Sequence, residues 1–391
     1  MIETLKPQNA DQVLQAVQWA ATKTPRPLEI IGHGSKRGLG RAVSAEAILD
    51  LSDLSGILLY EPEELVMSAK AGTPLVEIQA ALDDAKQILA FEPRGEGALY
   101  GTTGGTIGGV FATAQVGPRR PLVGSARDHL LGFHAVSGRG ENFKSGGRVV
   151  KNVTGFDLSK LMVGSMGTLA VMTEVTFKVL PRPEKSRTLL VFGAEDAGKC
   201  MRLAQNSTFE VSGVAHLPQN IARRSAVSYV KDCGRSVTAV RVEGLAQSVE
   251  ARCQALRALL APLGAVEELH TTNTQTLWQE IRDVDFFAQD HHIWRLSVPP
   301  SEGPAIAENL PKEHFFDWAG GLVWCGVEAS DPFDFRGAIH SGHATLMRAD
   351  EDVRARVPVF QPQPDGLAHV MDRVKSGFDP FGILNPGRLN T

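Results

Sequence analysis

Several features that mark other protein classes are missing from this chain of 391 residues. No apolar run approaches the roughly 20 residues that a membrane-spanning helix needs. No basic run accompanies the net charge of -4, so the composition argues against a nucleic-acid partner. The first residues lack a basic segment followed by an apolar one, so we expect no signal peptide. These absences predict a cytoplasmic protein.

Paired cysteines are also missing. Cys200, Cys233, Cys253 and Cys325 are far apart and form no C-x-x-C pair. This spacing fits neither a disulfide framework, nor a zinc site, nor an iron–sulfur cluster. We therefore expect a reducing compartment and no metal site.

Glycine, in contrast, is concentrated in one stretch: 17 of the 39 glycines lie in residues 93–167. Glycine costs conformational entropy on folding, so this density indicates backbone with positive φ or backbone that lies flat against another group. Hydroxyl side chains and arginines stand among these glycines. Such a mixture favours an anionic ligand with many contact points over a lipid or a peptide.

A second glycine loop, residues 32–40, follows a short apolar run at residues 28–31. A strand that leads into a glycine loop with Ser and Lys is the outline of an anion cradle, because successive backbone N–H groups converge on phosphate oxygens. A Rossmann turn is the main alternative, but the spacing here is G-x-G-x-x-x-G and no apolar helical stripe follows. An ordinary surface turn is the other alternative.

Residues 193–200 match the G-x-x-x-x-G-K pattern of a nucleotide-binding P-loop. The next position is Cys200, which has no hydroxyl for Mg²⁺, and two carboxylates occupy the loop. We interpret this segment as a strand–turn–helix junction with acids at the positive end of the helix.

Length favours two domains, and the composition changes after the Pro-Arg-Pro break at residues 181–183. The predicted domains are residues 1–183 and 184–378, with a tail at 379–391. The second has background glycine and four of the five Trp, and it is predicted as one antiparallel sheet with helices on one face.

The apolar periodicity predicts individual elements in both domains. Helices are predicted at residues 9–21, 73–82, 106–114, 156–163, 247–263, 305–310 and 367–378, and strands at 28–31, 48–51, 57–60, 66–71, 128–137, 168–179, 188–192, 236–242 and 292–298. In the helix at 156–163 we expect Leu158, Leu161 and Met162 to face inward.

Taken together, the motifs resemble the FAD-binding domain of the vanillyl-alcohol oxidase / p-cresol methylhydroxylase (PCMH) superfamily. The matching segments are residues 31–36, 101–109, 124–128, 155–158, 164–169 with 173–176, and the closing stretch 379–388. The resemblance implies an α+β fold: a PCMH-type FAD-binding domain of two subdomains, a smaller ferredoxin-like cap domain, and a C-terminal tail that returns to the flavin.

The resemblance also implies the residues that contact FAD. The FAD diphosphate would bind backbone amides of the 32–36 loop. The flavin and ribityl chain would lie along the 102–109 segment, and the 125–128 segment would continue that wall. Val171 would face the adenine, and Asn385 would close over the edge of the flavin ring. The carried-over residues are Gly32, His33, Gly34, Ser35, Lys36, Thr102, Gly104, Gly105, Thr106, Gly109, Ser125, Arg127, Asp128, Val171 and Asn385. The histidine that tethers flavin in some members aligns with Ser35, so we expect non-covalent FAD.

Within the superfamily the chain is most similar to the E-subunit family of bacterial glycolate oxidases. This similarity implies a complex with a second flavin (D-type) subunit and an iron–sulfur (F-type) subunit, in the cytoplasm or at the inner-membrane surface. The implied reaction is oxidation of glycolate, or a similar 2-hydroxy acid, with electrons passed to a partner. The scattered cysteines are consistent with that electron route.

No catalytic residue is assigned from the sequence. Catalytic relatives carry a His-x-Gly-Asp-Gly-Asn-x-His stretch that this chain lacks. The nearest counterpart is His340 and His343, for which we expect an exposed helix end, while residues 283–285 and 291–292 are expected at the surface or an interface. Two other functions stay open: a self-sufficient flavin oxidase of another small alcohol or hydroxy acid, and a structural subunit with a vestigial flavin site.

Overall fold

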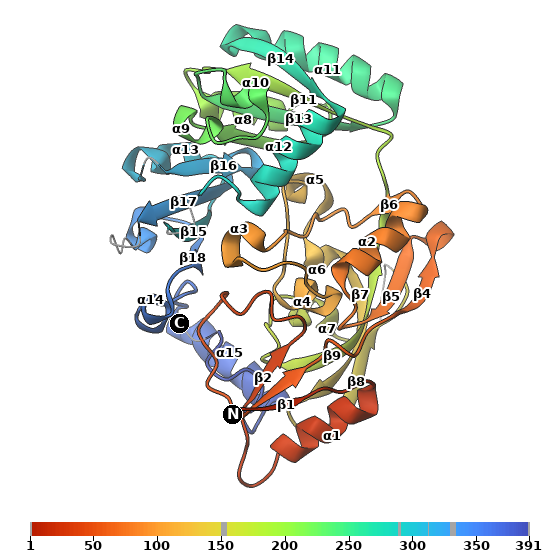
Figure 1. Ribbon diagram of the computed structural model, residues 1–391. Helices are drawn as coiled ribbons and strands as arrows, with labels where there is room; N and C mark the ends of the chain where they lie inside the picture. The colour runs from red at the N-terminus through yellow and green to blue at the C-terminus, as the bar shows by residue number, and fades with distance from the viewer. Residues whose placement is uncertain (1, 150–154, 288–290, 312, 329–333, 390–391) are drawn as a thin grey trace.

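The computed structural model describes residues 2–149, 155–287, 291–311, 313–328 and 334–389. Its strands form two groups (Figure 1): three small sheets in the first half of the chain and one large sheet in the second half. Residues 150–154 of the glycine-rich stretch and the last two residues of the predicted tail lie outside the described residues.

The first region has two main sheets, one of three strands and one of five, which agrees with two subdomains. The parallel sheet has the order β1 (Glu3–Leu5), β3 (Ala47–Asp50), β2 (Leu28–Ile31); the antiparallel sheet has the order β4 (Ile57–Glu61), β5 (Val66–Lys70), β9 (Ala170–Lys178), β7 (Leu130–Ser137), β8 (Asn142–Gly146); and β6 (Gln87–Ile88) pairs with β10 (Leu180–Pro181). Its helices are α1 (Ala10–Ala20), α2 (Leu75–Asp84), α3 (Gly97–Tyr100), α4 (Ile107–Ala112), α5 (Arg120–Val123), α6 (Ala126–His129) and α7 (Leu158–Met162).

Local sequence explains the first helix and the central strand. The Asn9 side chain caps α1 by accepting from the backbone N–H of Gln12, and the helix buries Val13, Val17 and Ala20. The strand β9 lies between β5 and β7, and most of its residues on both faces are buried.

The second region holds one eight-stranded sheet in which the strands pair antiparallel. The order is β14 (Ala265–His270), β11 (Lys185–Phe192), β13 (Val237–Gly244), β12 (Val211–Leu217), β16 (His314–Asp317), β17 (Leu322–Glu328), β15 (His291–Ser297), β18 (His343–Arg348). The first four strands have the order 4-1-3-2 of a ferredoxin-like unit, and the last four repeat it in reverse. The two units join where β12 meets β16, with His216 opposite Phe316.

Helices lie on both faces of this sheet, so the expectation of helices on one face is wrong. The helices of this half are α8 (Ala197–Gln205), α9 (Gln219–Ala222), α10 (Ser228–Lys231), α11 (Ala246–Leu260), α12 (Thr271–Asp283), α13 (Gly303–Ile306), α14 (Glu351–Arg356) and α15 (Asp365–Phe378). Alternate strand residues separate the faces: Leu189 packs in the core with α8 and α11, and Leu190 packs in the core with α12. Figure 1 shows α12 between the sheet and the first region.

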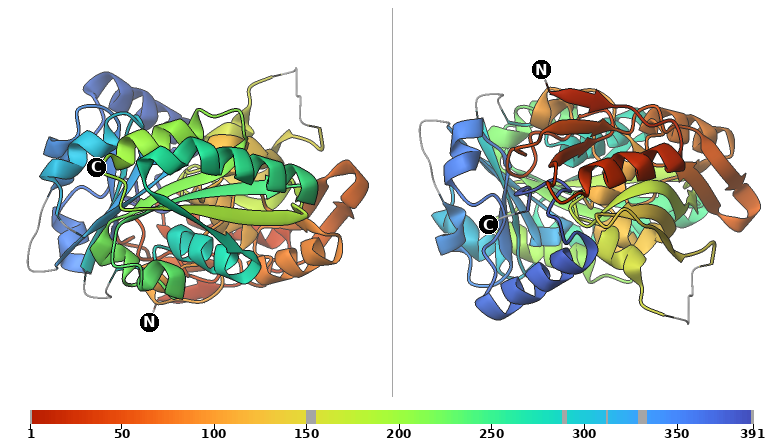
Figure 2. Two further views of the ribbon diagram at one scale, coloured as in Figure 1. Left: turned by 90° about the horizontal axis from the view of Figure 1, so that it is seen from above. Right: turned by 90° about the horizontal axis from the view of Figure 1, so that it is seen from below.

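The C-terminal segment lies against the first region. In the view from below, α15 and the N-terminal strands both lie on the near face of the molecule (Figure 2, right). Lys375 of α15 donates to the carbonyl oxygen of Thr168, at 2.6 Å, and Leu28 N–H donates to the carbonyl oxygen of Ile383, at 2.8 Å. The predicted boundary at residue 378 stays a proposal, as does the boundary at residue 183, two residues before β11.

Two local expectations need correction or refinement, and a third is confirmed. The predicted strand at 128–137 begins at Leu130, because residues 126–129 form the short helix α6. Leu161 is 37% exposed, whereas Met162 is fully buried, so the inward face of α7 is narrower than expected. The P-loop-like segment is a helix cap as expected: the Asp196 side chain accepts from the backbone N–H of Lys199 at the start of α8. None of the helices in the described residues is both long and apolar enough to span a bilayer.

Candidate functional site

The glycine loop after β2 lines a cavity in the first region. Residues 32–46 form turns and bends between β2 and β3, with no helix, so the loop is not a Rossmann turn. Gly34 has φ +68°, a left-handed conformation that favours glycine. The cavity holds about 800 Å³ of space, including its open mouth, between this loop, α4, β9 and the C-terminal segment.

The glycines of the loop and of α4 are needed for close packing. A Cβ on Gly32 would lie 2.4 Å from Oγ1 of Thr106, and one on Gly108 would lie 2.7 Å from Cβ of Ala71. A Cβ on Gly105 would lie 2.9 Å from Nζ of Lys36. Because these positions leave no room for a side chain, the cavity offers bare backbone to a ligand, together with the charged side chains of Lys36, Arg37 and Arg388 that line it.

Most of the predicted cofactor-binding residues lie at this cavity. Those lining it are Gly32, His33, Gly34, Ser35, Lys36, Thr106, Gly109, Val171 and Asn385. Thr102, Gly104 and Gly105 lie directly behind the loop: the Thr102 hydroxyl donates to the carbonyl oxygen of Ser35, at 2.9 Å. The structure therefore brings together twelve of the fifteen, from segments far apart in the chain.

Ser125, Arg127 and Asp128 are not among the residues that line the cavity. The Asp128 carboxylate accepts from both N–H and Oγ of Ser125, at 2.7 and 3.0 Å, and caps α6. These hydrogen bonds, led by the one from the Ser125 backbone, lower the pKa of Asp128. Arg127 donates to the carbonyl oxygen of Lys160. The structure gives these three residues a role in local folding, and their contact with flavin stays a prediction.

Asn385 holds the wall of the cavity together. Its Oδ1 accepts from Ile30 N–H at 2.8 Å, and its Nδ2 donates to the carbonyl oxygen of Met166 at 2.7 Å. The side chain thus joins β2 to the 164–169 segment. The predicted closure over a ring edge would have to occur alongside these two bonds.

A buried ion pair that the sequence motifs did not predict lies at the inner side of the loop. Nζ of Lys36 is 3.7 Å from Oε1 of Glu96, and both side chains are largely buried. Burial lowers the pKa of Lys36 and raises the pKa of Glu96. Gln115 also donates to Glu96. The signal was present in the Pro-Arg-Gly-Glu-Gly sequence at residues 93–97, where charged residues stand between glycines.

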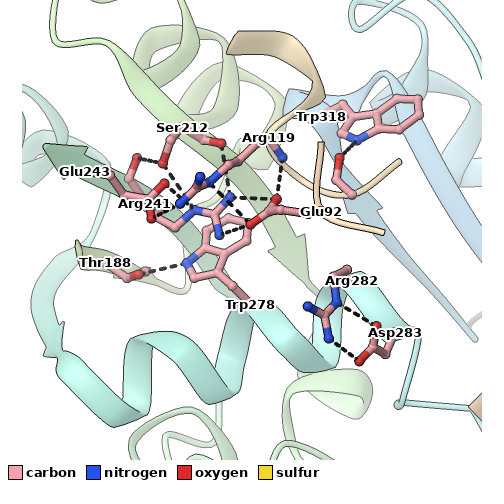
Figure 3. Close-up of polar contacts among 11 residues, drawn as sticks. Glu92, Arg119, Thr188, Ser212, Arg241, Glu243, Trp278, Arg282, Asp283 and Trp318 are labelled. Carbon is pink, nitrogen blue, oxygen red and sulfur yellow. Dashed lines mark hydrogen bonds and ion pairs between the residues drawn. The ribbon is translucent and has the colours of Figure 1, made fainter. Parts of the chain in front are cut away.

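A second group of charges joins the two regions (Figure 3). The carboxylate of Glu92 accepts from Nη1 of Arg241 at 2.8 Å and from the backbone N–H of Arg119 at 2.8 Å, and Nη2 of Arg119 donates to Glu243 at 2.7 Å. Arg241 also stacks on Trp278, with Cζ 4.5 Å from the ring centroid. We call these four charged residues, Glu92, Arg119, Arg241 and Glu243, the paired cluster. Its charges satisfy one another, which indicates a structural role.

The histidine and aspartate candidates have different surroundings. His340 and His343 are exposed as expected, but they follow a short 3₁₀ helix (Phe335–Ala338) and His343 begins β18. His292 is buried, so a surface position is wrong for it; its Nε2 lies 3.6 Å from Oδ2 of Asp350. Asp283 lies at the interface between the regions and accepts from Gly95 N–H at 2.7 Å.

Among the described residues, no group of three or more His, Cys, Asp or Glu side chains is placed to hold a metal ion. The residues at the cavity instead suit a dinucleotide. The walls are glycine backbone that an added Cβ would obstruct, and a lysine lies at the loop. These features fit the diphosphate and the flat ring of FAD.

Comparison with known proteins also indicates an FAD-binding protein. Residues 3–146 match the model of the FAD binding domain family. The chain is 37% identical over 383 residues to the glycolate oxidase subunit GlcE of Escherichia coli, a match that covers 97% of this chain and 95% of that protein. It is 35% identical over 167 residues to a D-lactate dehydrogenase of Anaerostipes hadrus, covering 42% of this chain and 34% of that one.

Solved structures share the fold at low identity. A 4-ethylphenol oxidase from Gulosibacter chungangensis matches with a TM-score of 0.71 at 14% identity, covering 99% of this chain and 88% of that one. A p-cresol methylhydroxylase with bound substrate matches with a TM-score of 0.69 at 14% identity over the same shares.

Proposed function

Because the chain belongs to the family of the glycolate oxidase subunit GlcE, within the PCMH-type FAD-binding flavoproteins, we propose that it is the FAD-binding subunit of a glycolate oxidase complex. The proposed reaction is oxidation of glycolate, or a similar 2-hydroxy acid, to the 2-oxo acid. The proposed partners are a D-type flavin subunit and an iron–sulfur F-type subunit, which receives the electrons. The proposed location is the cytoplasm or, through the complex, the surface of the inner membrane.

The observation that carries the proposal is the full-length match to GlcE, since the match extends beyond the FAD-binding domain and covers 95% of that protein. The chain is an FAD-dependent oxidoreductase of the hydroxy-acid class. The cavity supports this because the loop and α4 offer bare backbone and one lysine to an anionic cofactor.

Separate segments of the chain would bind separate parts of FAD. The amides of the loop at residues 32–36 and the Lys36 ammonium would hold the FAD diphosphate, and the 102–109 segment would lie along the ring. When bound, FAD supplies the ring that accepts a hydride from the α-carbon. The protein must also provide a cation for the substrate carboxylate and a base for the hydroxyl proton.

The test is to purify the chain alone and then with its proposed partners. We expect a yellow protein whose flavin is released by acid precipitation, which tests non-covalent binding. Bleaching of the flavin by glycolate only when the D-type and iron–sulfur subunits are present supports the proposal. Bleaching by the isolated chain with another alcohol supports a self-sufficient oxidase, and a colourless protein that FAD does not reconstitute supports a vestigial site.

A further inference from the structure

Three arginines from distant parts of the chain meet where the first region faces the large sheet. Arg120 of α5 and Arg295 of β15 stack on Trp318, with Cζ 4.3 and 5.1 Å from its ring centroid. Arg94, in the segment before α3, lies over Trp324 with Cζ 5.6 Å from that centroid. We call Arg94, Arg120 and Arg295 the unpaired cluster.

The sheet register fixes this arrangement. Arg295 pairs with Trp324 on β17 on one side and with Thr345 on β18 on the other, so its side chain shares a face with theirs. Trp318 is held from the first region, because its Nε1 donates to the carbonyl oxygen of Gly117 at 3.0 Å. The position of the cluster therefore depends on both regions.

Among the residues that the structure describes, none forms an ion pair with any of these three arginines. Arg94 is 6% exposed, and its Nε is buried without a hydrogen-bond partner. Arg120 is exposed, so the cluster has a buried floor and a side open to solvent. Buried arginines elsewhere in the interface, such as Arg119 and Arg241, do have carboxylate partners.

Three acids interact electrostatically with these arginines, and each of them accepts a hydrogen bond from another residue. Asp317 of β16 interacts electrostatically with Arg295, but burial raises the pKa of Asp317 to about 7 and its Oδ1 accepts from Trp318 N–H. Glu96 interacts electrostatically with Arg94 but also pairs with Lys36. Asp128 interacts electrostatically with Arg120 but also caps α6. Burial, followed by repulsion from Arg94 and Arg120, lowers the pKa of Arg295 to about 9.

The segment that carries Arg94 also contacts the loop that lines the cavity of the first region. Arg94 is two residues from Glu96, which pairs with Lys36, and Lys36 lines the cavity. His343 follows on the other side: it pairs in register with Ser297 on β15, and partial burial together with Arg295 and Arg120 lowers its pKa. His343 therefore lies near two of the three arginines, Arg295 and Arg120.

We propose that Arg94, Arg120 and Arg295 bind the carboxylate of a small hydroxy acid, with Trp318 as the apolar wall between two of the guanidinium groups. Arginine offers a planar fork of donors that matches a carboxylate in a bidentate geometry. An anion at this place would offset the mutual repulsion of three cations that form no ion pair among the described residues. The identity of the ligand as a hydroxy acid rests on the proposed function; the anion-binding character rests on the cluster itself.

The test uses the flavin-loaded protein and oxalate as the probe, because oxalate has two carboxylates and no α-hydrogen to lose. Binding is measured by calorimetry and by the fluorescence of tryptophan. We expect saturable binding to the native protein, and a loss of at least about tenfold in affinity for each of Arg94→Met, Arg120→Met and Arg295→Met, as expected for a charge-assisted contact. The matched control, Arg356→Met, removes an exposed arginine of α14 that pairs with Asp352, and it should bind oxalate like the native protein.

One further variant and one neutral ligand test whether binding depends on the arginine fork and on the negative charge of the ligand. Arg295→Lys retains a charge without the fork, and we expect affinity between that of the native protein and that of Arg295→Met, with unchanged flavin absorbance and melting temperature. The neutral amide of glycolate should bind at least about tenfold more weakly than oxalate. Native affinity in Arg295→Met, equal binding of the amide, tighter binding of inorganic phosphate, or no oxalate binding by the native protein would each overturn the proposal.

Flavin reduction by glycolate in the complex is recorded separately. If oxalate binds and the arginine variants lose it, but glycolate never reduces the flavin, the proposed reaction fails and the carboxylate site stands. If glycolate reduces the flavin equally in native and Arg295→Met proteins, the reaction stands and the site fails.

Discussion

The interface between the two regions contains two groups of arginines, one paired with carboxylates and one without ion pairs among the described residues. In the paired cluster, Arg119 and Arg241 reach Glu243 and Glu92 at 2.7 and 2.8 Å. In the unpaired cluster, three guanidinium groups lie over Trp318 and Trp324 without an ion-pair partner among the described residues. Both groups are formed by residues from both regions.

The comparison separates a structural contact from a binding site. Charged side chains that pair with one another need no ligand to balance them. Removing one of them leaves the other buried and uncompensated. Charges that do not balance leave favourable energy for an incoming ligand of opposite sign. The cavity of the first region also suits an anionic ligand, because glycine backbone and Lys36 line it.

The largest expected effect comes from filling that cavity. Gly34→Val places a β-branched side chain at φ +68° in the loop, so we expect loss of FAD, measured by visible absorbance. Gly234→Val is the matched control: Gly234 has φ +67° and open space around it, in the second region. The Gly234→Val protein should have backbone strain similar to that of Gly34→Val and should keep its yellow colour. A yellow Gly34→Val protein would show that the loop does not hold the cofactor.

Breaking the paired cluster should give the next largest effect. Glu92→Gln removes the charge that faces Arg241, and we expect the free energy of unfolding to fall by about 3–5 kcal/mol, measured by urea denaturation. Glu141→Gln, at an exposed position in the turn before β8, serves as control and should change little. Equal stability of the two variants would mean that the pairing does not hold the interface.

Acid should destabilise the protein through His216, which is buried where the two halves of the sheet join. Burial, with a smaller contribution from His314, lowers the pKa of His216 to about 4, and its Nδ1 lies 2.9 Å from Oγ1 of Thr238. The unfolded chain takes up the proton near its ordinary pKa of 6.5. The unfolded state therefore binds more protons between these values, and stability is lost as pH falls through this window, by about 3 kcal/mol in all.

The variant His216→Gln keeps a partner for Thr238 and removes the titration. Its free energy of unfolding should depend less on pH between about 6.5 and 4 than that of the native protein. Parallel curves for the two proteins would place the acid sensitivity elsewhere.

The smallest expected change distinguishes the two clusters most directly. Arg295→Met removes a cation that has no ion-pair partner, so the stability of the ligand-free protein should stay the same or rise by up to about 1 kcal/mol. The measurement is urea denaturation in a buffer without carboxylates. A loss as large as that of Glu92→Gln would mean that Arg295 is held by a structural contact and would remove the distinction.

The local features were accessible from the sequence because short-range patterns encode them. The apolar spacing of residues 9–21 predicted α1, and the glycines after residue 31 predicted a loop with bare backbone. The acids at residues 195–196 correctly identified a helix cap in place of a P-loop. The family resemblance depends on the same short motifs, and the full-length match confirms it.

Other features depended on contacts that no local pattern contains. Asp128 lies in a helical turn because its carboxylate caps the N–H of Ser125, although the surrounding residues read as a strand. The second face of the large sheet is covered by α12 and the first region, which the pattern of the strands alone did not reveal.

The sequence by itself determined where the backbone is bare, since glycine at a given position limits the side chains there in any fold. Only the tertiary structure decided which charges meet. Residues 94, 120 and 295 are separated by up to 201 positions in the chain (295 − 94), and β15, α5 and the segment before α3 bring them to the same two tryptophans. Electrostatic interaction depends on distance in space and on burial, and neither quantity is set by spacing along the chain.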